Sequence, residues 1–316
     1  MPFTTVDLVT SIKPPQVSEY LVYPWLYPGR LCLCVGATNI GKTTATLEII
    51  SQLLKGDHLW DRYPCKKIDK ILYLHAEHTL ATLQEAAATR GDLPSNAITV
   101  IHEFGENGPA LLDPNCRPTP CFHELRRFVA DFRPNLIIAE PISAFIGTSE
   151  NDNHEARMVV SMLANLGASV GASVLSHHHV GKAAFDPDKT APEGIASGVA
   201  RGAMAFEDAA ESIIYLKRSG KKGENHMRIE TPKAKGFPIS PVTIAFDEDT
   251  LSYTHVPQPF QERDLIAIYD RVRKHPNETN TDLINYFRNL WTCTPNKVVL
   301  MMRRAVKVGL LPSSFI

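Results

Sequence analysis

The chain has 316 residues, 33 of them lysine or arginine and 34 aspartate or glutamate, and 44% of its residues are hydrophobic. These values are typical of a globular protein with one large domain or two smaller ones. No apolar run approaches the roughly 20 residues of a membrane span, and the N-terminus lacks the basic and apolar regions of a signal peptide. The six cysteines form no C-x-x-C pair, which favours free thiols over a metal site. We therefore expect a cytoplasmic protein without membrane contact.

Residues 1–30 contain five prolines and are interpreted as an N-terminal arm that leads to the first core strand. Residues 31–35 (LCLCV) form a short apolar run typical of a buried strand, and residues 44–54 carry apolar side chains at helical spacing. Between them, residues 36–43 (GATNIGKT) fit the P-loop pattern G-x-x-x-x-G-K-[ST]. A strand, a glycine loop and a helix are the context that this motif requires.

The P-loop predicts binding of ATP together with Mg²⁺. Its glycines allow backbone N–H groups to turn towards phosphates, and the following helix adds the positive end of its dipole. Lys42 is expected to reach the β- and γ-phosphates, and the Thr43 hydroxyl is expected to hold Mg²⁺. The predicted nucleotide-binding residues are Gly36, Ala37, Thr38, Asn39, Ile40, Gly41, Lys42, Thr43 and Thr44.

Further apolar runs alternate with helical patterns along the chain. The expected strands are residues 71–74, 97–101, 136–139 and 173–175, and the expected helices between them are residues 121–132 and 154–166. This alternation predicts an α/β domain whose mainly parallel sheet is covered on both faces. The runs that follow look like additional strands, which we expect to be antiparallel: residues 212–216, 227–230 and 242–246.

Two of the predicted strands lead into a carboxylate. Glu140 directly follows the apolar run 136–139, the Walker B arrangement, where it would hold the water shell of Mg²⁺ opposite Thr43. Aspartate is usual at this position, and the extra methylene of Glu140 leaves direct metal contact open. Glu77 follows the strand at 71–74 and could polarise the attacking water from the same edge of the sheet.

Histidines cluster near the same strand ends. Residues 177–179 are three consecutive histidines, and His75 and His78 follow the second strand. Adjacent residues on a strand point to opposite faces, so three in a row cannot easily bind one ion. We therefore favour a role for His178 or His179 in sensing the γ-phosphate over a metal cluster.

Residues 257–316 are expected to form a separate C-terminal domain after an ATPase domain at residues 31–256. Residues 260–316 carry a net charge of +4, against −5 for the rest of the chain. Helical patterns at residues 261–274, 281–290 and 295–308 predict a winged-helix-like domain with a short or missing wing, or a helical cap or oligomerisation element. The last helix would be the recognition helix, with Asn296, Lys297, Arg303, Arg304 and Lys307 as candidate contacts.

Together these motifs resemble the RecA-like ATPases of RepA-like hexameric replicative helicases of plasmids and phages. The similar segments extend over roughly residues 20–255. They are residues 36–44, 71–78, 136–141, 173–182, 199–203 and 231–236. The resemblance implies a RecA-like core, a hexameric ring with nucleotide between subunits, and single-stranded DNA in the channel. It also implies that Glu77 is the catalytic base, Glu140 the Walker B acid and His179 the sensor.

Rings of this type complete each site with a cationic finger from the neighbouring subunit. The plasmid helicases carry an arginine at the position of Glu211, so this chain departs from the pattern there. Lys233 and Lys235 are the candidate catalytic substitutes, and Arg201 is the third. The alternative is that all three are surface cations near a turn.

Residues 184–197 are polar, small and proline-containing, and are expected to form a mobile loop. In a ring motor such a loop faces the channel, and Lys182 and Lys189 would then contact DNA phosphates. A surface loop without this role is the alternative.

The expected function is an ATP-hydrolysing motor of DNA replication or recombination, a ring helicase with replication proteins as further partners. One alternative is a DNA-binding regulator or loader that uses ATP as an assembly switch. Another is a clock-type ATPase that does not act on nucleic acid. The basic C-terminal region favours the first two, and the absence of N-K-x-D argues against GTP.

Overall fold

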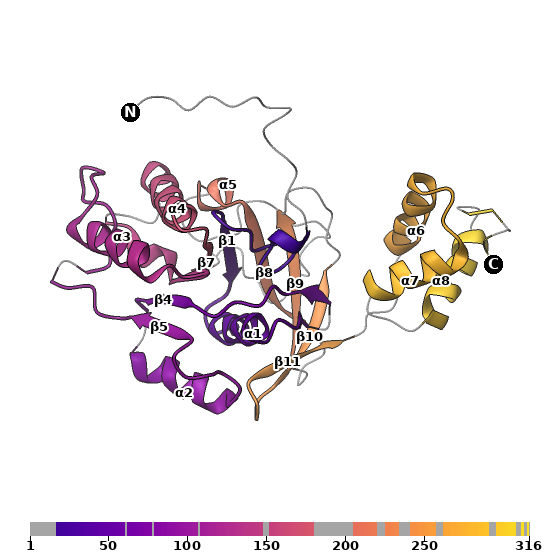
Figure 1. Cartoon of the computed structure of the whole chain (residues 1–316), viewed down its shortest axis with the longest axis horizontal. Helices are drawn as coiled ribbons and strands as arrows, with labels where there is room; N and C mark the ends of the chain where they lie inside the picture. Colours follow the sequence, from indigo (N-terminus) through magenta and orange to yellow (C-terminus); the bar gives the residue numbers. More distant parts are fainter. Residues whose placement is uncertain are drawn as a thin grey trace.

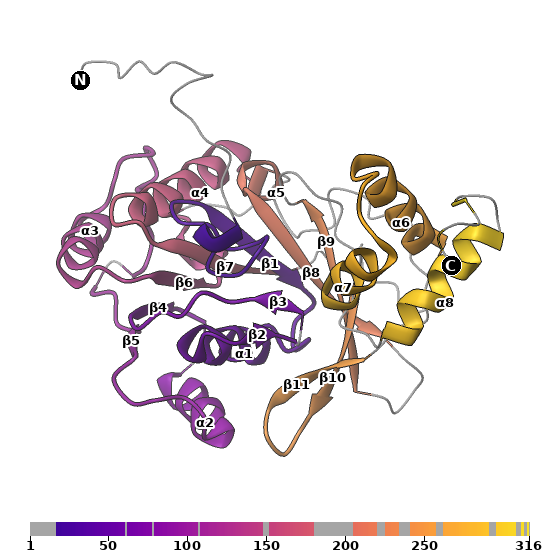
Figure 2. The same ribbon diagram turned by 45° about the vertical axis from the view of Figure 1, so that its right-hand side comes forward.

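The computed structural model describes residues 17–60, 62–77, 79–106, 108–147, 152–179, 205–219, 225–233, 241–256, 262–290, 295–307, 311–312 and 315. Within these ranges the chain forms a large sheet with helices on both faces and a group of three helices near the C-terminus (Figure 1). A view turned by 45° shows the antiparallel end of the sheet between the helix-covered part and the C-terminal helices (Figure 2).

The strand order of the nine-stranded sheet is β11-β10-β9-β8-β1-β7-β6-β4-β5. Its strands are β1 (Leu31–Gly36), β4 (Ile71–His75), β5 (Ile98–Ile101), β6 (Leu136–Glu140), β7 (Ser173–His179), β8 (Ser212–Ser219), β9 (His226–Lys233), β10 (Val242–Asp247) and β11 (Ser252–Val256). The strands from β5 to β8 in this order run parallel to one another, and β9, β10 and β11 continue the sheet in antiparallel fashion. The predicted α/β class with a mainly parallel sheet is confirmed.

The expectation that residues 212–216 are antiparallel is wrong for one of their two neighbours. Their strand, β8, pairs in parallel with β1 and in antiparallel fashion with β9. The chain reaches β8 from β7 through a long connection that includes α5 (Ala205–Ala209), and such a crossover returns a strand in the same direction. The change of direction falls instead between β8 and β9, which are consecutive in sequence and form a hairpin.

Helices cover the two faces of the sheet separately (Figure 1). Side chains of β1 alternate between two cores: Cys32 and Cys34 pack on the side of α1, whereas Leu31, Leu33 and Val35 pack on the side of α4. On the first side lie α1 (Lys42–Lys55) and α2 (Leu80–Arg90), and on the second lie α3 (Pro120–Phe132), α4 (Asn153–Ala168) and α5.

Local sequence explains where several of these helices begin and end. The Thr119 side chain accepts a hydrogen bond from the backbone N–H of Phe122 at the start of α3, where Pro120 occupies the first turn. Asp152 caps α4 in the same way. Gly56 ends α1 in the left-handed conformation that favours glycine. These boundaries keep each helix within the length of the strand that it covers.

The described part of the expected N-terminal arm belongs to the core. Trp25 is only 2% exposed and packs against Trp60 and Tyr63, and its indole N–H donates to the hydroxyl of Thr231 (3.1 Å) in β9. Beside it lies a small sheet of β2 (His58–Leu59) and β3 (Tyr63–Pro64). Residues 17–30 therefore help to cover one face of the large sheet instead of leading to it as a free arm.

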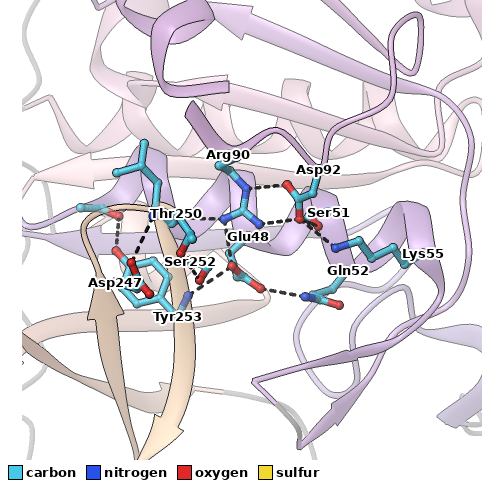
Figure 3. A network of polar contacts seen from close by, with 12 residues as sticks. Glu48, Ser51, Gln52, Lys55, Arg90, Asp92, Asp247, Thr250, Ser252 and Tyr253 are labelled. Atoms are coloured by element: carbon cyan, nitrogen blue, oxygen red, sulfur yellow. Dashed lines mark hydrogen bonds and ion pairs between the residues drawn. The ribbon is translucent and has the colours of Figure 1, made fainter. Parts of the chain in front are cut away.

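A buried polar network joins α1, α2 and the turn between β10 and β11 (Figure 3). Arg90, the last residue of α2, donates to Glu48 of α1 (2.9 Å), to both oxygens of Asp92 (3.1 Å each) and to the backbone carbonyl of Leu251 (2.7 Å). Glu48 also accepts from the backbone N–H of Tyr253 (3.4 Å). The network anchors the far end of α2, the helix that follows Glu77.

The C-terminal helices are α6 (Glu262–Lys274), α7 (Asn280–Leu290) and α8 (Pro295–Lys307). They surround a small core of their own, built from Ile268, Leu283, Phe287, Val298, Met301, Met302, Ala305 and Leu311. The three predicted helices are therefore present, and no strand occurs among the described residues after β11. Across the described ranges, no helix combines the length and the apolar character needed to cross a membrane.

Candidate functional site

The predicted P-loop forms the turn between β1 and α1. Gly36 is the last residue of β1, and α1 begins directly after Gly41, whose φ of 100° lies in the left-handed region. A Cβ atom on Gly41 would lie 2.8 Å from the hydroxyl oxygen of Tyr253, so a larger residue would also clash. The loop thus places the first N–H groups of α1 at one edge of the sheet, where a helix N-terminus favours phosphate.

Lys42 lies inside this loop with 6% of its surface exposed. Its Nζ atom donates hydrogen bonds to the carbonyl oxygens of Gly36 (3.2 Å) and Ala37 (3.0 Å). Burial lowers the pKa of Lys42, and the nearby carboxylates of Glu77 and Glu140 act against this shift. A bound phosphate would replace the two carbonyl oxygens as the acceptor of the same ammonium group.

A chain of hydrogen bonds connects Lys42 to Glu77 through His179. The Nζ atom of Lys42 lies 3.2 Å from Nδ1 of His179, and Nε2 of His179 lies 3.2 Å from Oε1 of Glu77. Because a lysine ammonium only donates, Nδ1 of the neutral ring accepts and Nε2–H donates to the carboxylate. The structure therefore brings together the P-loop lysine and the predicted base and sensor, which come from three different strand ends.

Glu140 ends β6 and is fully buried. Its Oε1 atom accepts hydrogen bonds from the hydroxyl of Thr43 and from Nδ1 of His177 (2.8 Å), and its Oε2 atom accepts from the hydroxyl of Tyr73. Burial alone would raise the pKa of Glu140, but its interactions with His177, His75 and Thr43 outweigh burial and hold that pKa well below its usual range. Glu140 is therefore ionised at neutral pH.

The three consecutive histidines of β7 point to alternate faces of the sheet. The Nε2 atom of His177 lies 2.6 Å from the hydroxyl of Thr46 in α1, whereas His178 packs on the opposite face against the ring of Phe206. His179 points back to the first face, towards the P-loop lysine. Of the two proposed sensors, His179 is the one that reaches the P-loop. Within the described ranges no group of three or more His, Cys, Asp or Glu could hold a metal ion.

A pocket of about 310 Å³ lies along this edge of the sheet. The P-loop, the ends of β4, β6 and β7, and the first turns of α2 form its walls. Its lining residues are Thr38, Asn39, Gly41, Lys42, Thr43, Thr44, His75, Glu77, Thr82, Leu83, Ala86, Glu140 and His179. The other predicted nucleotide-binding residues, Gly36, Ala37 and Ile40, shape the turn behind the pocket. Ile40 is 7% exposed and belongs to the core.

The residues at the floor of this pocket fit a magnesium ion. Thr43 directs its only hydroxyl proton to Glu140, so the lone pairs of its oxygen remain available to a cation. Hydroxyl, carboxylate and phosphate oxygens together with waters are the ligands that Mg²⁺ prefers. Both oxygens of Glu140 already accept protein hydrogen bonds, which favours contact with the metal through water.

The predicted finger residues do not line this pocket. Lys233 ends β9, and its backbone pairs with Ile213, whereas Gly36 of the P-loop pairs with Leu216, three residues further along β8. Lys233 therefore lies towards the opposite edge of its own sheet. Lys235 and Arg201, and the loop lysines Lys182 and Lys189, lie outside the described residues.

Glu211 also lies far from the P-loop. Its backbone N–H donates to the carbonyl of Leu31 at the start of β1 (3.0 Å), and its carboxylate forms an ion pair with Arg30. The P-loop begins at the other end of β1. The residue that departs from the helicase pattern is thus engaged within its own chain, at the edge of the sheet opposite the pocket.

Sequence reasoning assigned no role to Tyr73, Thr46 or His177. The signal that could have found two of them is the alternation of side chains along a strand. Tyr73 lies two residues before His75 on β4, and His177 lies two residues before His179 on β7, so each pair shares a face. The helix α2 was also missed, and with it the pocket residues Thr82, Leu83 and Ala86.

Comparison with known proteins agrees with this geometry. The sequence pattern of the AAA domain family (AAA_25) matches residues 1–184, more than half of the chain. Such a P-loop domain binds nucleoside triphosphate, usually with Mg²⁺, and hydrolyses it. No curated protein matches the chain significantly. Among solved structures, the ATPase domain of a phage replicative helicase is similar with a TM-score of 0.51 and 14% identity, over 73% of this chain and 86% of that one. At this identity the similarity establishes the fold, a RecA-like core.

Proposed function

Because the chain belongs to the AAA domain family, we propose that it is an ATPase that works as a DNA motor in replication or recombination, in the form of a ring-shaped helicase. The observation that carries this proposal is the hydrogen-bonded chain of Lys42, His179 and Glu77, which shares one pocket with Thr43 and Glu140. A site that only bound nucleotide would need no carboxylate held at the place where water must attack.

The described side chains divide the work of hydrolysis among them. Lys42 and the N–H groups of α1 hold the phosphates, and Glu77 orients and polarises the attacking water. Mg²⁺, when bound beside Thr43, neutralises charge on the β- and γ-phosphate oxygens. His179 touches both the lysine that would hold the γ-phosphate and the carboxylate that would activate water, so it can relay the state of the phosphate to Glu77.

The pocket supports completion by a second subunit. Among the described residues that line it, Lys42 is the only lysine or arginine. P-loop enzymes commonly add a second cation that stabilises the charge of the transition state. We propose that the neighbour in a hexameric ring supplies it, with Lys233, Lys235 and Arg201 as candidates. The position of Lys233 away from its own P-loop is compatible with action on the adjacent subunit.

The C-terminal helices supply the proposed contact with DNA. Residues 260–316 carry a net charge of +4, and α8 exposes Asn296, Leu300 and Arg303 on one face. A winged-helix-like domain would place this face against the DNA, with phosphate contacts that weaken as salt rises. Single-stranded DNA in the ring channel would contact the loop lysines Lys182 and Lys189.

Two substitutions test the ATPase assignment. Lys42→Ala should abolish ATP hydrolysis, and Glu77→Gln should retain ATP binding while its turnover falls by about 100-fold or more. Glu85→Gln is the matched control, because Glu85 lies on the exposed surface of α2 and should hydrolyse ATP normally. Normal turnover in Glu77→Gln would remove Glu77 from the role of base.

A DNA assay separates the proposed motor from its alternatives. Hydrolysis should rise with single-stranded DNA, and a forked duplex should be separated only when ATP is hydrolysed. DNA binding that depends on ATP without strand separation would indicate a regulator or loader instead. Hydrolysis that is indifferent to DNA at every salt concentration would indicate an ATPase that does not act on nucleic acid.

A further inference from the structure

The carboxylate of Glu140 is surrounded by protein donors. Oε1 accepts from Thr43 and from His177, and Oε2 accepts from the hydroxyl of Tyr73. The side chains of Glu140 and His177 are 1% and 0% exposed, so no water competes for these bonds. Tyr73 itself is fully buried in β4. Two residues from neighbouring strands therefore grip one oxygen each and leave the carboxylate a single orientation.

The ring of His177 is held in the form that this arrangement needs. The Thr46 hydroxyl lies 2.6 Å from Nε2, and the Glu140 carboxylate lies 2.8 Å from Nδ1. A carboxylate only accepts, so Nδ1 carries the proton, and Nε2 of the neutral ring accepts from Thr46. The hydroxyl on α1 thus selects the tautomer in which His177 donates to Glu140.

The fixed carboxylate in turn fixes the P-loop hydroxyl. Oε1 draws the Thr43 proton towards the protein interior, which leaves the lone pairs of Thr43 Oγ1 directed to the pocket. We propose that Tyr73 and His177 are positioning residues that act through Glu140 to aim the Thr43 hydroxyl at Mg²⁺. This inference rests on the proposed Mg²⁺–ATP site and adds two residues that never touch the nucleotide.

The test is the Mg²⁺ dependence of nucleotide binding in Tyr73→Phe. This change removes one hydroxyl and leaves the buried ring in place. Binding of a fluorescent ATP analogue is measured first in EDTA and then during titration with MgCl₂. The half-saturating Mg²⁺ concentration should rise by about 10–100-fold, as when partners of metal ligands are removed elsewhere. Affinity in EDTA should remain that of the wild type.

The chain offers a matched control in Tyr215→Phe. Tyr215 is 1% exposed, and its hydroxyl donates to the carboxylate of Glu207 (2.7 Å) on the opposite face of the sheet. This substitution breaks a buried bond of the same chemistry away from the pocket, so its Mg²⁺ titration should match the wild type. Equal shifts in both tyrosine variants would overturn the proposal in favour of a general effect on the fold.

Substitutions of His177 test the same idea independently. His177→Asn keeps an N–H donor near the place of Nδ1 and should preserve much of the Mg²⁺ response, whereas His177→Leu should lose it. An unchanged half-saturating Mg²⁺ concentration in Tyr73→Phe and His177→Leu would overturn the proposal, and so would an equal loss of affinity in EDTA. Wild-type nucleotide binding by Lys42→Ala would instead refute the proposed site itself.

Discussion

Arg90 provides the most direct test of how the fold holds the wall of the pocket. The side chains of Arg90 and Glu48 are only 2% and 3% exposed, and their atoms Nη1 and Oε2 lie 2.9 Å apart (Figure 3). Arg90→Met keeps much of the apolar stem but leaves the Glu48 carboxylate buried without its cation. Breaking a buried pair in this way costs about 3–5 kcal/mol of unfolding free energy.

The loss can be measured by urea unfolding, followed by the fluorescence of Trp25 and Trp60. Both indoles are 2% exposed and lie in the same core as α1, so they report its unfolding. With a urea m-value of about 2–3 kcal/mol/M, the midpoint of Arg90→Met should fall by roughly 1–2 M. ATP affinity should fall as well, because Arg90 anchors the helix that carries the pocket residue Leu83.

Two further variants decide whether the buried charge is the cause. In Arg90→Met/Glu48→Gln the charge is gone and an amide remains for the neighbouring donors, so most of the lost stability should return. Arg157 pairs with Asp208 at 3.3 Å, but both side chains are about 60% exposed, so Arg157→Met should cost less than about 1 kcal/mol. A double variant no more stable than Arg90→Met would refute the charge argument, and so would a similar loss in Arg157→Met.

Two more outcomes follow from the same region. Burial alone would raise the pKa of Asp92, but the hydrogen bonds that it accepts from three side chains outweigh burial and lower it to about 2. The stability that Asp92 contributes is present above its unfolded pKa and is lost between about pH 4 and pH 2, so over this range the urea midpoint should fall less steeply in Asp92→Asn than in the wild type. Gly41→Ala should reduce ATP affinity and melting temperature more than Gly91→Ala, because both residues have positive φ but only Gly41 has Tyr253 within 2.8 Å of the added Cβ; equal effects would exclude the steric explanation.

The sequence was most informative where one physical constraint dominates. Continuous apolar runs such as residues 136–139 fit only the interior of a covered sheet, so the parallel strands could be placed from sequence alone. The helix α2 was missed because its apolar spacing is weak and only Leu83 and Arg90 are buried in it. Likewise, β11 was interpreted as part of a linker, since its pairing with β10 depends on a turn whose partner, Arg90, is distant in sequence.

The site was predictable to the extent that it follows local motifs. Lys42 and Thr43 follow from the P-loop, and Glu77 and Glu140 from strand ends, and the structure brings all four to one pocket. The roles of Tyr73 and His177 depend on strand order, because β4 and β7 lie on either side of β6. No local pattern shows that two strands far apart in sequence flank the same carboxylate, so these residues emerge only from the assembled sheet.

The environments of the two carboxylates argue for a division of labour between them. Glu140 is 1% exposed, accepts hydrogen bonds from three side chains, and keeps its charge at one fixed point. Glu77 keeps 20% of its side chain exposed and lines the pocket beside His179. A locked carboxylate suits a constant task such as ordering the waters around a cation, whereas a carboxylate open to the pocket can meet a water molecule and accept its proton. The extra methylene of Glu140 is consistent with this division, because it lets the carboxylate reach donors on β4 and β7 at once.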